Sequence, residues 1–164
     1  MHIVLATDAD WIVSEITAAL GGPDTSFTLC REGRVVVGVV AEREPDLAIL
    51  DMQVGSKGGM AITMALRLDE SGGMLPHVPV IMLLDRRADV FLARRSGADG
   101  WLVKPLDPLR IKRAVAAVMA GGTYVEGVTP PVVEDLGAPV EASTPDEDEL
   151  ASPTIDTGEP APAG

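Results

Sequence analysis

The sequence predicts an α/β domain in which a five-stranded parallel sheet carries helices on both faces. Apolar runs alternate with helix-compatible stretches five times within the first 121 residues, which is the pattern of repeated strand–helix units. The runs are continuous and aliphatic, as in parallel strands that are buried on both faces. With 46% hydrophobic but only 3% aromatic residues, the core is expected to consist of aliphatic side chains. Short connections and right-handed crossovers leave few topologies to consider.

The five expected strands are His2–Ala6, Ser26–Cys30, Leu47–Leu50, Val78–Leu84 and Trp101–Val103. The five expected helices are Ala9–Leu20, Arg34–Glu44, Gly58–Leu68, Arg86–Arg95 and Leu109–Ala120. Either Asp8 or Asp10 is suited to cap the first helix. Pro108 fits the first turn of the last helix, where a missing N–H is tolerated. Residues at near-helical spacing suggest one face of the third and fifth helices: Met60, Met64 and Leu68, and Leu109, Ala116 and Met119.

The stretch Arg34–Glu44 is ambiguous by local preference. Its valines are β-branched and favour a strand. Its place between two expected strands and its charged end favour a helix instead. We therefore predict a helix in which Val36, Val39 and Val40 face the core.

The composition divides the chain near residue 121. Residues 122–164 hold 10 of the 25 acidic residues, none of the 13 basic residues and seven of the 13 prolines. Such a segment buries too little apolar surface to offset its ordering entropy. Residues 1–121 are thus expected to form the domain and residues 122–164 an acidic, Pro-rich, disordered tail, of which the short piece Thr123–Val133 could still pack on the domain.

Several classes of function are disfavoured by composition. The chain has no basic cluster that could neutralise a phosphate backbone, so direct nucleic-acid binding is not expected. No apolar run reaches the roughly 18 residues of a membrane helix. The single cysteine, Cys30, excludes an internal disulfide and fits a reducing compartment, so the expected location is the cytoplasm. No enzyme motif is present, and the chain is not expected to be an enzyme.

Polar residues follow the expected strands at the edge where a parallel α/β sheet binds ligands. They are Thr7, Asp8, Asp10, Asp51, Asp85 and Lys104. Carboxylates that converge beside a lysine can hold a hard cation such as Mg²⁺, which prefers oxygen ligands. A carboxylate near such a cation can also act as a nucleophile toward phosphorus.

Three segments, Ile3–Asp10, Leu47–Met60 and Gly97–Pro108, resemble the response regulator receiver family of two-component signalling. The sequence DLAILDM around Asp51 is similar to the strand that delivers the phosphoacceptor aspartate of that family, and GADGWLVKP is similar to its fifth strand and Lys-Pro motif. The resemblance covers residues 1–121. It implies a flavodoxin-like, receiver-type, doubly wound (βα)5 fold.

The resemblance also implies roles for individual residues. Asp51 would accept the phosphoryl group, and Lys104 would pair with the phosphoryl oxygens. Asp8, Asp51 and the main-chain carbonyl of Gln53 would bind Mg²⁺ weakly. Trp101 occupies the place of the aromatic switch residue. The Lys104–Pro105 bond matches a position where a cis peptide is expected.

Three positions depart from the family pattern. Thr7 stands where the family has a first acidic residue, although Asp10 could compensate through water. Leu84 replaces the usual Ser or Thr at the end of the fourth strand, so a hydroxyl that would contact the phosphoryl group is missing. Asp85 replaces a small residue and would oppose an incoming phosphate. These departures put the link between phosphorylation and Trp101 in question.

Two functions follow from these residues. The first is a stand-alone receiver that takes a phosphoryl group on Asp51 from a sensor histidine kinase or phosphotransfer protein. Its state would be read by a downstream effector or a second copy through the fourth helix, fifth strand and fifth helix. The alternative is a pseudo-receiver, a protein–protein interaction module that works without phosphorylation. Asp8, Asp51 and Lys104 favour the first function, whereas Leu84 and Asp85 favour the second.

Overall fold

A computed structural model of the chain describes residues 1–126. The strands are β1 (His2–Ala6), β2 (Ser26–Cys30), β3 (Leu47–Asp51), β4 (Val80–Leu84) and β5 (Gly100–Val103). The helices are α1 (Asp10–Leu20), α2 (Val36–Arg43), α3 (Gly59–Ser71), α4 (Val90–Ser96) and α5 (Pro108–Met119), with 3₁₀ turns at η1 (Gly33–Val35) and η2 (Arg87–Asp89). The part of the predicted tail from residue 127 onward lies outside the described residues.

The strands form one five-stranded parallel sheet in the order β2-β1-β3-β4-β5. This confirms the predicted fold. The first crossover leads outward to β2, and the chain then returns past β1 to β3, so the order reverses beside β1 and β3. Ligands of open parallel sheets bind at such a reversal, beyond the carboxyl ends of the strands.

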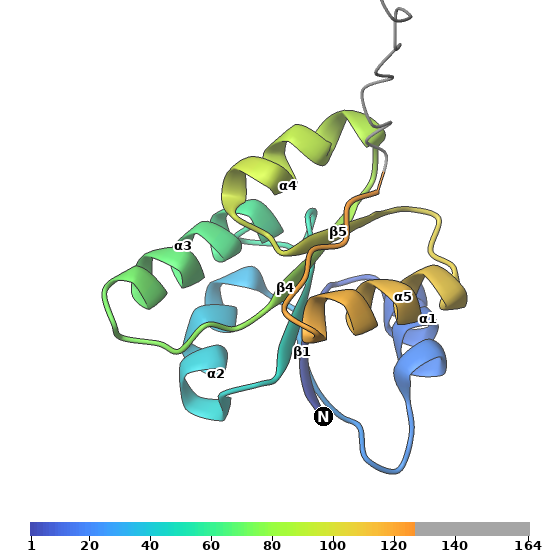
Figure 1. The fold of residues 1–164 in the computed structure, drawn as a ribbon, viewed down its shortest axis with the longest axis horizontal. Helices are drawn as coiled ribbons and strands as arrows, with labels where there is room; N and C mark the ends of the chain where they lie inside the picture. Colours follow the sequence, from blue (N-terminus) through green and yellow to red (C-terminus); the bar gives the residue numbers. More distant parts are fainter. Residues whose placement is uncertain (127–164) are drawn as a thin grey trace, which may run out of the picture. The chain divides into compact units, whose positions relative to one another are not determined.

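Alternate residues of each strand face opposite sides of the sheet, as the two-residue period of a strand requires, and they supply one apolar cluster on one face and two on the other. Ile3 and Leu5 pack with α1 and α5, whereas Val4 and Ala6 pack with α2 and α3. Figure 1 shows α1 and α5 together on one face of the sheet and α2, α3 and α4 on the other. Because β1 and β3 are buried on both faces, they read as unbroken apolar runs in the sequence.

The ambiguous valine-rich stretch is a helix, as predicted. It begins with the 3₁₀ turn η1 and continues as α2. Val36 and Val40 are buried and Val39 is half-buried. Burial against the sheet outweighs the modest strand preference of β-branched residues.

Neither Asp8 nor Asp10 caps α1 with its side chain; Ala9 occupies the cap position. The carboxylate of Asp10 instead pairs with Arg31 at 2.5 Å. A side-chain cap is present on α5, where Asp107 accepts hydrogen bonds from the backbone N–H groups of Leu109 and Arg110 at 2.9 and 3.0 Å. Both helices therefore begin within one residue of their predicted starts, but only α5 has an acidic side chain as its cap.

The residues seen at helical spacing lie mostly on the exposed sides of α3 and α5, although Met60 is half-buried against the cluster that contains Trp101. Met64 and Leu68 are 49% and 71% exposed. The buried face of α3 consists of Ile62, Thr63 and Leu66, and that of α5 of Ile111, Ala114, Val115 and Val118. Two apolar stripes are compatible with the 3.6-residue period of each helix, and contact with the sheet decides which one is buried.

The chain does not leave the domain immediately after α5. Tyr124 forms a parallel bridge with Gly100 of β5, and its side chain packs against the core beside α1 and α5. Figure 1 shows this segment running beside β5. The ordered body thus extends past the expected boundary at residue 121, within the piece expected to be able to pack on the domain.

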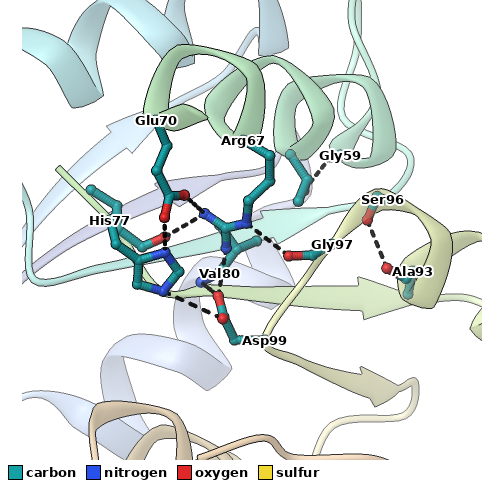
Figure 2. A network of polar contacts seen from close by, with 11 residues as sticks. Gly59, Arg67, Glu70, His77, Val80, Ala93, Ser96, Gly97 and Asp99 are labelled. Atoms are coloured by element: carbon teal, nitrogen blue, oxygen red, sulfur yellow. Dashed lines mark hydrogen bonds and ion pairs between the residues drawn. The ribbon is translucent and has the colours of Figure 1, made fainter. Parts of the chain in front are cut away.

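A group of four side chains, here called the Arg67 clasp, joins α3 to the turns that flank β4 and β5. It consists of Arg67, Glu70, His77 and Asp99 (Figure 2). Arg67 donates to Asp99 at 2.6 Å and to Glu70 at 2.9 Å, and His77 lies 2.6 Å from Glu70 and 3.4 Å from Asp99. Asp99 also accepts the N–H of Val80 at 2.7 Å. The clasp fixes the amino ends of two strands, at the edge of the sheet opposite to the predicted site.

Among the helices of residues 1–126, none combines the length and the apolar character that a bilayer crossing requires.

Candidate functional site

Asp51 is the last residue of β3 and lies at the carboxyl edge of the sheet. It is only 2% exposed, which is unusual for an acidic residue without partners. Its Oδ1 accepts hydrogen bonds from Lys104 Nζ at 2.8 Å and from the backbone N–H of Gln53 at 3.2 Å. Its Oδ2 accepts from the hydroxyl of Thr7 at 2.9 Å. Three donors therefore hold this buried carboxylate.

Thr7 directly follows β1 and is fully buried. Its side chain faces Asp51 at the end of β3, the strand that pairs with β1. Its Oγ1 also accepts the backbone N–H of Ala9 at 3.2 Å. The bond from Ala9 thus orients the hydroxyl, which donates its own hydrogen to Asp51. Sequence reasoning counted Thr7 only as the loss of a negative charge, whereas in the fold it is a direct partner of Asp51.

Lys104 follows β5 and lies between two carboxylates. Its Nζ is 2.8 Å from Asp51 and 2.9 Å from Asp85, whose side chain is 37% exposed. Burial disfavours the ammonium form, but the hydrogen bonds and charges of both carboxylates outweigh burial and raise the pKa of Lys104. The side chain is therefore held as a cation beside Asp51. The Lys104–Pro105 peptide is cis, as the family resemblance implied.

Asp8 and Gln53, the other two predicted metal-binding residues, lie on the loops after β1 and β3, and both are exposed. A methyl group at Gly55 would lie 3.6 Å from Asp8 Oδ2, so the carboxylate of Asp8 is directed toward the loop that follows Asp51. Within residues 1–126, no group of three or more acidic, His or Cys side chains is arranged to hold a metal ion.

Asp10 does not take part in this arrangement. Its pairing with Arg31 leaves it 89% exposed at the start of α1. Arg31 additionally donates to the main-chain carbonyl of Asp8 at 3.2 Å. The suggestion that Asp10 replaces the missing acidic residue through water therefore finds no support in the geometry.

Leu84 is fully buried at the end of β4 and belongs to the same apolar cluster as Met82, Ala93 and Trp101. The cluster lies between the sheet and α4. A leucine here offers packing toward Trp101 but no hydrogen bond toward Asp51. At this position the site and the predicted switch residue therefore share an apolar cluster rather than a hydrogen bond.

Trp101 is 4% exposed, and its indole N–H donates to the main-chain carbonyl of Glu126 at 2.8 Å. The second tryptophan, Trp11, was not singled out from the sequence. It is 48% exposed at the start of α1, and its ring centre lies 5.8 Å from Lys104 Nζ. This distance permits a cation–π contact. Since nothing in the sequence links Trp11 with Lys104, only the fold reveals this neighbour of the site.

The fold and the carboxylate–lysine arrangement at its carboxyl edge define a signalling module of the receiver class. Residues 3–116 match the family model described as response regulator receiver domain. The chain belongs to this family, the receiver domains of two-component response regulators.

Curated relatives agree with this assignment. The DNA-binding response regulator MtrA of Mycobacterium tuberculosis is 32% identical over 120 residues, which are 71% of this chain and 49% of MtrA. The transcriptional regulatory protein CseB of Streptomyces avermitilis is 30% identical over 140 residues, or 84% of this chain and 57% of CseB. The chain spans about half the length of these relatives. Protein PilH of Pseudomonas aeruginosa is 24% identical and is covered over 98% of its length.

Solved structures share the fold at lower identity. The chemotaxis response regulator CheY4 of Vibrio cholerae gives a TM-score of 0.63 at 20% identity, covering 71% of this chain and 97% of that one. The receiver domain of the sensor histidine kinase PA1611 of Pseudomonas aeruginosa gives 0.61 at 21% identity, covering 73% and 97%. That structure has a magnesium ion coordinated in its active-site cleft.

Proposed function

We propose that this receiver accepts a phosphoryl group on Asp51. The observation that carries the proposal is the placement of the Asp51 carboxylate at the end of β3, with Lys104 Nζ at 2.8 Å. A lysine in this position offsets the negative charge that a phosphoryl group brings to the carboxylate. Asp51 is held at the end of β3, and Lys104 reaches it from the end of β5, with β4 lying between these strands.

In the transfer step, a carboxylate oxygen of Asp51 forms a bond to phosphorus while the bond between phosphorus and the donor nitrogen breaks. The donor is a phosphohistidine of a sensor kinase or phosphotransfer protein, and its imidazole keeps the electron pair of the broken bond. The product is an acyl phosphate on Asp51. Lys104 stabilises the equatorial oxygens, and Thr7 holds the carboxylate in place through its hydroxyl.

The donor set at this edge suits Mg²⁺, which is commonly bound by one or two carboxylates and keeps several waters. Asp8 and Asp51 would supply the carboxylates and Gln53 a main-chain carbonyl. When bound, the cation would neutralise charge on the phosphoryl oxygens. With two rather than three acidic side chains, we expect weak binding. The magnesium site of the PA1611 receiver domain supports this choice of cation.

The phosphorylated state would be read by a protein partner at the surface of α4, β5 and α5. Two side chains of this surface are exposed: Phe91 on α4 is 64% exposed and Leu109 on α5 is 57% exposed. β5, which lies between these helices, is the last strand of the sheet. An effector, or a second copy of the chain, would bind there. The trigger would have to pass through the apolar cluster that contains Leu84 and Trp101.

The proposal is tested by titrating the protein with beryllofluoride, a mimic of the phosphoryl group, in the presence of Mg²⁺. Trp11 should report binding by fluorescence because it lies 5.8 Å from Lys104. We expect a saturable, Mg²⁺-dependent change that is absent in Asp51→Asn. Trp11→Phe is the matched control and shows whether Trp101 responds as well. If calorimetry detects no binding to the wild-type protein either, the phosphoacceptor proposal is wrong.

A second candidate, a pseudo-receiver that binds partners without phosphorylation, is favoured by a different observation. Asp85 competes with Asp51 for Lys104, and the buried Leu84 offers no hydroxyl. Under this alternative, partner binding would be indifferent to Asp51→Asn and to Asp8→Ala. It would remain sensitive to substitutions on α4 and α5, such as Phe91→Ala. Parallel measurement of these variants with one partner separates the two functions.

A further inference from the structure

The edge of β5 is covered by a segment of the chain itself. β5 pairs with β4 on one side, and its other side would present unpaired N–H and C=O groups. Tyr124 fills this position: the N–H of Trp101 donates to Tyr124 O at 3.0 Å, and Tyr124 N–H donates to Asp99 O at 3.1 Å. We call residues Tyr124–Glu126 the strap.

Backbone pairing between the strap and β5 is limited to this one bridge. Beyond it, the side chain of Glu126 accepts the next hydrogen bond from β5. The N–H of Val103, the next donor of β5 that faces the strap, donates to the carboxylate of Glu126 at 2.7 Å rather than to a main-chain oxygen. The same carboxylate receives the guanidinium of Arg110, with Nε to Oε1 at 2.5 Å. The indole N–H of Trp101 meets the Glu126 carbonyl. Glu126 thus satisfies three separate donors of the β5–α5 region.

The guanidinium of Arg110 is held in position by hydrogen bonds to two main-chain carbonyl groups. Its Nη1 donates to Pro105 O at 2.8 Å and its Nη2 to Val103 O at 2.7 Å, which orients the fork toward Glu126. A hollow of about 390 Å³ adjoins this pair and is also lined by Arg87 and Lys104. Arg110 binds the Glu126 carboxylate directly and Arg87 adds a favourable charge, whereas Lys104 is engaged by Asp51 and Asp85. This arrangement selects an extended segment that carries a carboxylate.

The contacts that hold the strap remain partly accessible to solvent. Glu126 and Arg110 remain 21% and 31% exposed, and Val125 is 48% exposed. A second hollow of about 360 Å³ lies between Val125, Trp101 and Arg94. The entropy lost on ordering each strap residue offsets part of the stability that these hydrogen bonds provide. Such a segment can be exchanged for another that makes the same contacts.

We infer that the β5 edge is a docking site for an extended, acidic segment of a partner protein, and that the strap occupies this site in the free chain as a built-in competitor. The partner segment would add to the sheet in the way the strap does, with main-chain groups opposite Gly100 and Trp101 and an acidic residue at Arg110. This inference rests on the proposed partner surface of α4, β5 and α5. It does not depend on phosphorylation of Asp51.

The site is tested on the full chain with a fluorescent peptide that carries the strap sequence, acetyl-Gly-Thr-Tyr-Val-Glu-amide. We expect the peptide to bind Glu126→Ala at least tenfold more tightly than the wild-type protein, in which the strap blocks the site. A peptide that ends in Gln should bind the variant at least tenfold more weakly. Glu134→Ala, which removes the next acidic residue along the chain, is the matched control and should behave as wild type.

Hydrogen exchange provides a readout that needs no peptide. In Glu126→Ala, and in Glu126→Gln, which keeps the side-chain shape, the Val103 amide and the Trp101 indole N–H should exchange at least tenfold faster than in the wild-type protein. Amides of β1 and β3 should be unchanged, which shows that the domain stays folded. Asp51→Asn should leave both the exchange rates and peptide binding unchanged. A failure of the docking-site inference can therefore be told apart from a failure of the proposal that Asp51 accepts a phosphoryl group.

Two results would overturn the inference. One is unchanged exchange at Val103 and Trp101 in both Glu126 variants, together with equal peptide binding to wild type and Glu126→Ala. The other is a dimer of the wild-type protein in sedimentation that dissociates in Glu126→Ala. That result would assign the strap site to a second copy of the chain rather than to a partner protein.

Discussion

Lys104 and Asp85 form a hydrogen bond of 2.9 Å between Nζ and Oδ1 at the mouth of the site. The same ammonium group also binds Asp51, so its charge is divided between two acids. A phosphoryl group on Asp51 would have to displace Asp85 from Lys104 or accept its repulsion. This relationship, rather than the absence of any one residue, sets how readily the site accepts an anion.

Asp85→Ala should tighten the binding of beryllofluoride. The substitution frees Lys104 and removes a like charge, an effect worth about 1 kcal/mol for a partly exposed pair, or about a fivefold change in affinity. Asp85→Asn retains the shape but not the charge and should give a similar gain. Calorimetry in the presence of Mg²⁺ measures both. Equal affinities in all three proteins would mean that Asp85 does not compete with the ligand.

Thr7→Asp should raise the affinity for Mg²⁺ by about tenfold, because it adds a third carboxylate to a site that has two. Without the cation the same variant should be less stable than the wild-type protein, since Thr7 is fully buried and faces the carboxylate of Asp51. Thermal unfolding with and without Mg²⁺ measures both effects. Thr7→Val serves as the control, because it loses the hydroxyl without gaining a charge. If Thr7→Val bound Mg²⁺ as tightly as Thr7→Asp, the added charge would not be the cause of the higher affinity.

Leu84→Thr should lower the free energy of unfolding by about 2 kcal/mol, because a fully buried apolar side chain is replaced by a smaller one with a polar hydroxyl. Leu84→Met, which nearly conserves volume, should cost less than about 1.5 kcal/mol. Urea unfolding followed by circular dichroism measures the difference. In contrast, a tolerated threonine would show that this position is already shaped to receive a hydroxyl.

Asp99→Ala should lower the free energy of unfolding by about 3 kcal/mol. It leaves the buried N–H of Val80 without its acceptor and Arg67 without one carboxylate. Asp10→Ala removes an acid from the exposed pair with Arg31 and should change stability by less than about 0.5 kcal/mol. Denaturant unfolding of the two variants compares them directly. Similar losses for both would contradict a structural role of the Arg67 clasp.

Glu126 should make the stability of the folded domain dependent on acidic pH. Burial alone would raise the pKa of Glu126, but hydrogen bonds from Arg110 and Val103 and the charges of Arg110 and Arg87 outweigh burial and lower it. A carboxyl whose pKa is lower in the folded state contributes stability fully above its unfolded pKa, about 4.3, and loses it as the pH falls through the folded value.

The free energy of unfolding of the wild-type protein should therefore exceed that of Glu126→Gln at pH 7, and the difference should shrink below about pH 4. Denaturant unfolding at a series of pH values measures it. A difference that stays constant down to pH 3 would show that the charge of Glu126 does not contribute.

The strands and the order of elements were predictable from sequence for a physical reason. Parallel strands buried on both faces must be continuously apolar, so β1, β3 and β4 are visible as short aliphatic runs. The residue that follows each run then falls at the carboxyl edge of the sheet. For this reason the sequence pattern places Asp51 and Lys104 at the same edge of the sheet, although the two residues lie 53 positions apart, and the structure shows that they are in direct contact.

Helix faces were less predictable. Local spacing indicated stripes of α3 and α5 that the structure exposes, because a second apolar stripe on each helix meets the sheet instead. The 3.6-residue period identifies an amphipathic helix but does not say which of two apolar stripes is buried. The direction from which the sheet approaches decides that.

By itself, the sequence determined the α/β class, the alternation of elements and the residue types at the edge of the sheet, since these depend on local hydrophobic pattern and on chain direction. Only the tertiary structure decided which partners these residues have. The bonds of Thr7 to Asp51, of Asp85 to Lys104 and of Glu126 to Arg110 join distant or unpatterned positions. Side-chain pairing of this kind is set by the packing of separate elements, which no local pattern encodes.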